Sequence, residues 1–221
     1  MSSPPFFSIV MASYLGDYGG NYGRSATNRT EKFKRAVRSV IDQDQHTTSW
    51  ELVIVADGCQ ETMLHACLWP DPRIRFIEIP KQRLWSANVR NTGIRHSTGD
   101  YIVYLDTDDV LAPSHLADLR TFLFRRDQPQ WAVFDDLVWN PNKNVWEQRV
   151  ANSSRARGAG TSQIAHSRES GILWPDVEFR HPHMGYDHDE QFLKHLRKFH
   201  GGDWIGSGGY YVMHIPRLYD L

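Results

Sequence analysis

The chain has 221 residues, which is enough for one sizeable α/β domain and short for two. The formal net charge of −1 gives no overall attraction to nucleic acid or to an acidic membrane. No apolar run approaches the roughly twenty residues that cross a bilayer, and the first residues lack the basic region and apolar core of a signal peptide. We therefore expect a soluble protein of the cytoplasm without an integral membrane segment.

The first half of the chain alternates predicted strands with predicted helices. Short apolar runs, rich in β-branched and aromatic residues, predict strands at residues 6–13, 50–56, 73–79 and 101–105. Apolar residues at helical spacing predict helices at residues 30–41 and 86–96, and the second starts on the cap residue Ser86. This alternation predicts an α/β fold, with a mostly parallel central sheet and helices on both faces.

The strand at residues 101–105 ends in a group of acids. Asp106, Asp108 and Asp109 lie within four residues of one another, and Pro113 then opens a predicted helix. Carboxylates this close raise one another's pKa, and a divalent cation that prefers hard oxygen ligands relieves the repulsion. The plainer interpretation is a polar loop in which one Asp caps the helix, but a cap needs one acid and this segment has three.

The second half contains further predicted strands. They lie at residues 131–139 and 206–216, and a turn at residues 140–144 joins the first of them to residues 145–149. In the first half, Ser13, Asp57 and Asp106 stand at the carboxyl ends of predicted strands. Ligands of open α/β sheets bind at this edge, so we expect one shared site there. The Gly- and Tyr-rich loop at residues 14–23 either packs against a flat ring or is a surface excursion without a ligand.

With these pieces in place, the chain resembles family 2 glycosyltransferases of the GT-A fold, a Rossmann-like α/β architecture. The matching pieces occur in the family's order, at residues 8–14, 36–43, 51–58, 87–94, 98–102 and 106–109. An acid group alone would be weak support, whereas an ordered series of pieces is specific. The resemblance implies a single domain over residues 1–221, with a nucleotide-sugar-binding half at 1–109 and an acceptor-binding half at 110–221.

The resemblance also implies roles for individual residues on the donor side. In this family the acids of an Asp-x-Asp motif bind a metal that bridges the diphosphate of a nucleotide sugar, so Mn²⁺ or Mg²⁺ is the expected cofactor and a UDP-sugar the default donor. Asp106 would face the ribose or the metal, and Asp108 would bind the metal directly. The nucleotide would be held by Ala12, Ser13, Tyr14, Asp57, Asp106 and Thr107.

Three basic residues are candidates for a second positive group near the phosphates. Arg90 is the first of them. The equal alternative is that Arg90 is simply a solvated or ion-paired residue of its helix. Lys81 and Arg83, in the loop before that helix, are weaker candidates for the same task.

Two departures from the family pattern affect the catalytic side. The loop at residues 15–29 is longer than the usual short connection. The family often has a Glu-Asp pair at the start of a late helix, whose Asp acts as general base. Here Asp189 fits that position best, with His188 and Asp187 as further candidates. These polar residues are also typical of a helix N-terminus, where the helix dipole favours acids.

His214, near the end of the chain, is a candidate metal ligand by the same resemblance. The equal alternative is a surface histidine that follows an edge strand. Residues 161–168 resemble the strand that lines the acceptor side in this family. Other candidate contacts with the acceptor are Trp174, Phe179, His181 and His183. A Trp beside a Pro is more often ordinary packing, so Trp174 keeps that alternative.

The expected function is metal-dependent, inverting transfer of a sugar from a nucleotide donor to a hydroxyl acceptor. The acceptor is a saccharide, a lipid-linked intermediate or a small molecule. A modified base in DNA is less favoured, raised only by Arg149, Arg155, Arg157 and Arg168 and opposed by the absence of overall positive charge. The competing classes are a nucleotidyltransferase or phosphohydrolase that uses the same acids, and a sugar-nucleotide-binding module without catalysis.

Overall fold

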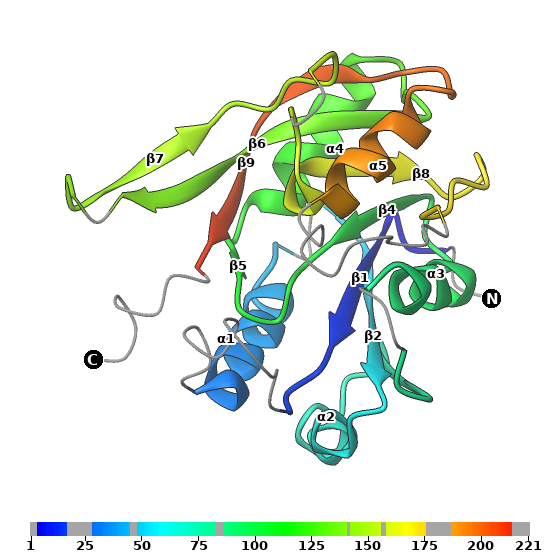
Figure 1. Ribbon diagram of the computed structural model, residues 1–221, viewed down its shortest axis with the longest axis vertical. Coiled ribbons are helices and arrows are strands. Elements are labelled where there is room, and N and C mark those ends of the chain that lie inside the picture. Colours follow the sequence, from blue (N-terminus) through cyan, green and yellow to red (C-terminus); the bar gives the residue numbers. More distant parts are fainter. Residues whose placement is uncertain are drawn as a thin grey trace.

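The computed structural model describes residues 4–16, 28–44, 48–82, 86–140, 142–155, 158–175 and 187–213. Within these residues, nine strands form one sheet, in the order β3-β2-β1-β4-β8-β6-β9-β5, with β7 paired to β6 (Figure 1). The expected α/β architecture is therefore present. No helix among the described residues is long and apolar enough to cross a membrane.

The first four strands of this order are parallel. They are β1 (Phe7–Ser13), β2 (Trp50–Asp57), β3 (Ile74–Ile79) and β4 (Tyr101–Tyr104). β1 lies between β2 and β4, with Phe7 opposite both Trp50 and Tyr101. Because parallel strands share direction, the carboxyl ends of β1, β2 and β4 lie on one edge of the sheet.

The remaining strands form a mixed half. They are β5 (Val110–Leu111), β6 (Trp131–Asn140), β7 (Val145–Arg149), β8 (Ile164–Ser167) and β9 (Asp203–Val212). β8 joins the halves, since it is antiparallel to both β4 and β6, while β9 runs parallel to β6. The hairpin of β6 and β7 projects from the side of the molecule (Figure 1).

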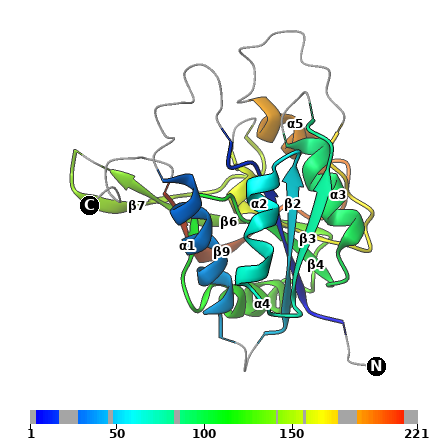
Figure 2. The ribbon, with the colours of Figure 1, turned by 90° about the horizontal axis from the view of Figure 1, so that it is seen from below.

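Helices cover both faces of the sheet. Successive side chains of β1 point to opposite faces, and both sets are buried. Phe7, Ile9 and Met11 pack in one core with α1 (Arg29–Ile41) and α4 (His115–Arg125). Val10, which points the other way, packs in a second core with α3 (Ala87–His96) and α5 (Asp187–Leu196). Figure 2 shows α1 and α3 on either side of the parallel strands. A short helix, α2 (Gln60–Leu64), follows β2.

Two local expectations need correction, and one short strand was not predicted. β5 has two residues and no sequence signal of its own, and it exists because it pairs with β9. Thr161–Gln163 is a 3₁₀ turn before β8, so that strand is shorter than expected. Ser86 holds the N-cap position of α3, but its side chain makes no capping hydrogen bond.

Candidate functional site

The acid group forms the turn between β4 and β5, and its members differ in exposure. Asp109 is buried, where its carboxylate accepts hydrogen bonds from the Tyr210 hydroxyl at 2.9 Å and the Met213 N–H at 2.7 Å. The Tyr210 hydroxyl in turn accepts from the Asp106 N–H at 3.2 Å. Asp109 therefore fixes the turn to β9, which leaves Asp106 and Asp108 as the more exposed acids.

The electrostatics of this turn favour a cation. Burial raises the pKa of Asp109 well above its usual range, and the charges of Asp108 and Asp106 raise it further. Crowded carboxylates of this kind are stabilised by a bound divalent ion, which supplies the largest positive charge in such a site. Among the described residues, no group of three or more His, Cys, Asp or Glu side chains is arranged to hold a metal by itself. Asp106 and Asp108 offer two carboxylates, and any further ligands would come from a substrate or water.

Arg90 reaches this turn from α3, and close helix packing places it there. An added Cβ at Gly93 would lie 2.5 Å from Val10 Cγ1, so the glycine lets α3 approach β1 closely. The Arg90 guanidinium donates to Asp106 Oδ1 at 3.1 Å, and its other Nη lies 3.5 Å from His188 Nδ1. The Arg90 side chain is 8% exposed and that of Asp106 is 40% exposed. Arg90 is thus a buried, ion-paired residue that faces the acids.

Trp174 and His188 complete the surroundings of Arg90. The guanidinium carbon lies 4.6 Å from the centre of the Trp174 ring, and His188 stacks on the same ring system at 4.6 Å. Trp174 is buried, stacks on Phe192 of α5, and donates from its indole to the Tyr104 hydroxyl at 3.0 Å. The packing alternative therefore describes Trp174 better than contact with an acceptor.

His188 is a neutral imidazole in this setting. Burial and the charge of Arg90 lower the pKa of His188 to about 3, although the charge of Asp106 acts in the opposite direction. Its ring packs against Trp174, and hardly any of it reaches solvent. The first turn of α5 is thereby tied to α3 and to the acid turn.

Asp189 lies on a different side of α5, beside the 3₁₀ turn. The Thr161 hydroxyl donates to Asp189 Oδ1 at 2.5 Å, while Oδ2 has no hydrogen-bond partner among the described residues. An added Cβ at Gly160 would lie 3.4 Å from Asp189 Oδ2 and 3.7 Å from Arg149 Nη2, so both groups border the same small space. The half-buried Asp189 is accessible to a ligand in a way that His188 is not.

The nucleotide candidates at the ends of β1 and β2 also lie together. Asp57 accepts from Lys81 Nζ at 2.5 Å and from the Gln82 N–H at 2.6 Å. Lys81 Nζ also lies 3.8 Å from the centre of the Tyr14 ring. The Ser13 hydroxyl is buried and lies 2.9 Å from the Thr62 hydroxyl, so Ser13 and Ala12 would meet a ligand through their backbone. An open pocket of about 630 Å³ adjoins this edge, lined by Gly58, Gln60, Glu78, Ile79 and Pro80.

Several other predicted residues do not join the site as described. His214, Arg83, Phe179, His181, His183 and most of the loop at residues 15–29 lie outside the described residues, as does the side chain of Asp187. The four arginines that raised a nucleic-acid acceptor do not act as one group. Arg149 pairs with Asp136, Arg168 donates to the Gly99 carbonyl at 2.8 Å, and Arg157 lies outside the described residues. The Asp136–Arg149 pair is the feature of the site that sequence reasoning missed.

Residues 25–185 match the family model described as Glycosyl transferase family 2. The chain belongs to this family. Among curated relatives, the poly(ribitol-phosphate) beta-N-acetylglucosaminyltransferase TarP of Staphylococcus aureus (strain N315) is 31% identical over 97 residues, which cover 43% of this chain and 30% of TarP. The predicted membership of the glycosyltransferase enzyme family is thus confirmed.

Solved structures show the same fold. TarS 1-349 of S. aureus, in complex with UDP-GlcNAc, has a TM-score of 0.67 at 13% identity and covers 96% of this chain and 61% of that chain. The mannosyltransferase PcManGT of Pyrobaculum calidifontis, in complex with GDP-Man and Mn²⁺, has a TM-score of 0.64 at 18% identity. The match covers 99% of this chain and 59% of the PcManGT chain. The GT-A fold is therefore confirmed. The chain spans about 60% of these solved chains and less than a third of TarP.

Proposed function

We propose that this protein transfers a sugar from a nucleoside-diphosphate sugar to a hydroxyl group of an acceptor, with a divalent metal as cofactor. The observation that carries the proposal is the acid turn at the carboxyl edge of the parallel strands, beside Asp57, in a chain of family 2. This edge is where open α/β sheets bind ligands. Residues 1–109 form the donor half of the proposed site, and residues 110–221 form the acceptor half.

The residues of the turn fit a magnesium or manganese ion. Mg²⁺ is commonly held by one or two carboxylates together with substrate phosphates, and Asp106 and Asp108 are two partly exposed carboxylates on one short turn. A bound ion would neutralise the charge that develops on the departing diphosphate. Arg90 keeps the Asp106 carboxylate oriented toward the turn through its 3.1 Å hydrogen bond. His214 remains a proposed additional ligand.

On the donor side, Asp57 and Tyr14 are proposed to hold the nucleobase. Asp57 is oriented by Lys81 and by the Gln82 N–H, and Tyr14 presents a ring next to the same lysine. The backbone of Ala12 and Ser13 borders this position, and Thr107 lies in the acid turn itself. TarS is described with UDP-GlcNAc and PcManGT with GDP-Man, and we favour a UDP-sugar for this chain.

On the acceptor side, we propose Asp189 as the general base of an inverting transfer. A base must lie within hydrogen-bond reach of the hydroxyl whose proton it takes, and Asp189 is only half-buried, with its Oδ2 beside Gly160. Thr161 holds the other carboxylate oxygen and so fixes the side chain. His188 is buried against Trp174 and Arg90, and burial disfavours the protonated ring that would form, so His188 serves better as a positioning residue. Asp187 remains the second candidate.

The first test measures thermal stability with Mn²⁺ and a panel of nucleoside diphosphates, in the wild type and in Asp108→Ala. A ligand that binds only the folded state raises the melting temperature, by an amount that follows its concentration relative to Kd. We expect one nucleotide to stabilise the wild type in a metal-dependent manner, and we expect the mutant to lose that response. If no nucleotide stabilises the wild type, the proposed function is wrong.

The second test separates catalysis from binding and uses the nucleotide that the first one identifies. Asp189→Asn keeps the shape of the side chain but cannot accept a proton. We expect kcat to fall by about 10²–10⁴-fold, while the nucleotide stabilises the variant as it does the wild type. Unchanged turnover would support a binding module or a different base, and release of pyrophosphate in place of a nucleoside diphosphate would support a nucleotidyltransferase.

A further inference from the structure

A second arginine, Arg149 of β7, borders the proposed acceptor side of the site and is anchored to a buried carboxylate. Its Nε donates to Asp136 Oδ1 at 2.9 Å, and its Nη2 donates to Asp136 Oδ2 and to the Ser162 hydroxyl. The Ser162 hydroxyl donates to Asp136 Oδ2 at 2.8 Å. The Asp136 side chain is fully buried, whereas that of Arg149 is 47% exposed. The carboxylate therefore serves as an anchor that holds the guanidinium at the surface of the site.

The guanidinium of Arg149 lies close to the proposed base. Its Nη2 and Asp189 Oδ2 both adjoin the space above Gly160, and its Nη1 has no hydrogen-bond partner among the described residues. Burial alone would lower the pKa of Arg149, but the hydrogen bond and charge of Asp136, together with the charges of Asp109 and Asp189, raise it. The guanidinium thus remains a fixed positive charge at the site.

We infer that Arg149 binds an anionic group, a phosphate or a carboxylate, on the acceptor molecule. This inference rests on the proposed function and names the class of its second substrate. A guanidinium presents a planar fork of donors that matches the oxygens of phosphate and carboxylate, and its strongest hydrogen bonds are to such anions.

The acceptor is a better match for Arg149 than the donor diphosphate is. The diphosphate is expected at Asp106 and Asp108, where Arg90 already supplies a guanidinium. Arg149 belongs to the mixed half of the sheet, and its Nη2 borders the same small space above Gly160 as Asp189 Oδ2 does. An acceptor whose hydroxyl meets Asp189 can therefore place a neighbouring anionic group on Arg149.

The experiment compares three sugar probes, one neutral and two anionic. Methyl β-glucoside is neutral, its glucuronide carries a carboxylate, and glucose 6-phosphate carries a phosphate. Each is added with Mn²⁺ and the nucleoside diphosphate that stabilises the protein, and its Kd is obtained from the shift in melting temperature. We expect at least one anionic probe to bind roughly tenfold or more tightly than the neutral one, because hydrogen bonds to charged groups are the stronger class.

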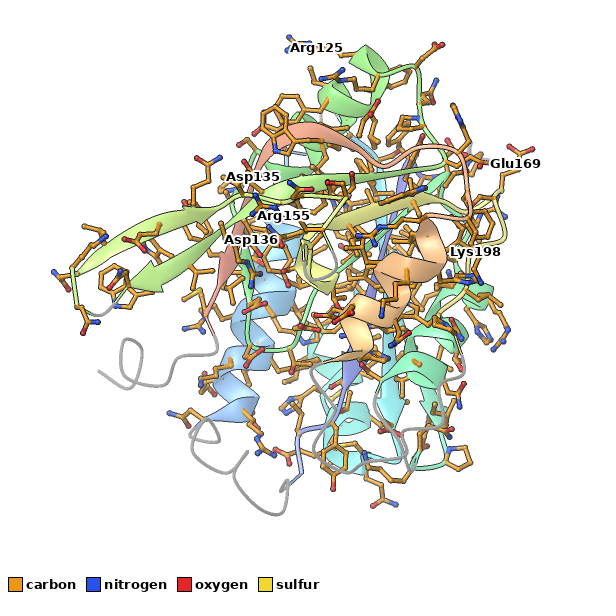
Figure 3. All side chains as sticks on the ribbon, turned by 45° about the horizontal axis from the view of Figure 1, so that its top comes forward. Arg125, Asp135, Asp136, Arg155, Glu169 and Lys198 are labelled. Atoms are coloured by element: carbon orange, nitrogen blue, oxygen red, sulfur yellow. The ribbon has the colours of Figure 1, made fainter. Side chains whose placement is uncertain are left out.

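Two variants test Arg149 without leaving a buried charge unpaired. The double variant Asp136→Asn/Arg149→Gln removes both charges of the pair. Gly160→Ala keeps both charges but places a methyl group at 3.4 Å from Asp189 Oδ2 and 3.7 Å from Arg149 Nη2, and its extended backbone (φ −94°) accepts alanine. We expect both variants to lose the preference for the anionic probe. Arg125→Gln is the matched control. Arg125 ends α4 and lies far from Asp135 and Asp136 in Figure 3, so its variant should keep the preference for the anionic probe.

The outcomes distinguish this inference from the proposed function. If the wild type binds neutral and anionic probes equally, or if the double variant keeps the preference, the inference is wrong while the glycosyltransferase proposal stands. Stabilisation by inorganic phosphate equal to that by glucose 6-phosphate would assign a free anion to Arg149 and would also overturn it. If no nucleotide changes the melting temperature, the proposed function is contradicted. The sugar probes, added without a nucleotide, then still show whether Arg149 binds an anionic group.

Discussion

The two arginines of the site form ion pairs with opposite arrangements. In the Arg90–Asp106 pair the arginine is 8% exposed and the carboxylate 40%, whereas in the Arg149–Asp136 pair the carboxylate is fully buried and the arginine is 47% exposed. In each pair the buried member orients the exposed one. The first pair therefore presents a negative group, suited to a metal ion, and the second presents a positive group, suited to an anion.

The surroundings of the buried members show how each pair is held. Arg90 is enclosed by the Trp174 ring and by His188, so that an aromatic wall and a neutral imidazole replace water around the guanidinium. Asp136 accepts its hydrogen bonds from Arg149 and Ser162. A buried carboxylate depends on such donors much more than a partly exposed one does. This difference predicts that replacing Arg149 lowers the unfolding free energy more than replacing Arg90 does.

The largest effect is expected from Arg149→Gln, which leaves the charge of Asp136 buried without its partner. Breaking a buried pair in this way costs about 3–5 kcal/mol of unfolding free energy. Arg90→Gln leaves the partly exposed Asp106 near water, and we expect a loss of about 1 kcal/mol, mainly from the lost contact with Trp174. Urea unfolding at pH 7 measures both.

The double variant Asp136→Asn/Arg149→Gln is the control for that comparison, because it removes the buried charge together with its partner. It should recover most of the stability lost in Arg149→Gln. Equal losses in the two single variants would show that burial of the carboxylate does not distinguish the pairs. A double variant as unstable as Arg149→Gln would assign the cost to packing of the hairpin and not to charge.

The two pairs also differ in how far the sequence predicts them. The acid turn after β4 and Arg90 on α3 were candidates from local patterns, since an apolar run that ends in acids and a helical period are both visible in short windows. The same local signals predict β1, β2 and β4 and their shared edge. What they do not show is that Asp109 turns inward to Tyr210, a residue about a hundred positions away in the chain.

The Asp136–Arg149 pair was not predicted, for a physical reason. Asp135 and Asp136 lie inside a strand, and two adjacent acids in a strand sequence are typical of an exposed edge. Only the register of the β6–β7 hairpin shows that Asp136 lies opposite Arg149. Both carboxylates are buried because partners reach them from other segments, including Trp204 of β9 for Asp135. Trp174 and His188 illustrate the same limit, because their stacking depends on the packing of α5. Long-range pairing of this kind has no local sequence signal.

A smaller effect is expected from the imidazole that adjoins Arg90. An unfolded histidine has a pKa of about 6.5, whereas the pKa of His188 is lowered to about 3 in the fold. Below pH 6.5 the unfolded chain takes up a proton that the folded chain does not, so stability falls as the pH falls, and it is unaffected above that range. At pH 5 His188 should account for a loss of about 2 kcal/mol relative to pH 7.

His188→Gln tests this contribution. The difference in unfolding free energy between wild type and variant should be constant above pH 6.5 and should shift in favour of the variant below it. The other deeply buried histidines, His115 and His166, are present in both proteins, so their effects cancel in the difference. A difference that does not change with pH would mean that the ring gains a proton in the fold, and that Arg90 is less enclosed than its contacts indicate.

The smallest effect concerns a third pair, Lys81–Asp57, which is arranged like the Arg149–Asp136 pair but has a less buried carboxylate. Its lysine side chain is 48% exposed and its carboxylate 13%, and the Gln82 N–H also holds Asp57. Because neither charge is fully buried, Lys81→Gln should change the unfolding free energy by less than about 1 kcal/mol. If Asp57 contacts the nucleobase and Lys81 orients it, Kd for the nucleoside diphosphate should rise by roughly threefold, as for one weak, partly solvated interaction.

Isothermal titration of the nucleotide measures that change, with Lys143→Gln as the matched control. Lys143 is also an exposed lysine paired with a carboxylate, Glu147, but it lies on the hairpin of β6 and β7 away from β2, so its variant should bind normally. An unchanged Kd in Lys81→Gln would remove the pair from the nucleotide site. A loss of affinity of more than tenfold would mean that the exposed lysine itself contacts the nucleotide. In all three pairs the buried member would then hold the exposed one toward a ligand.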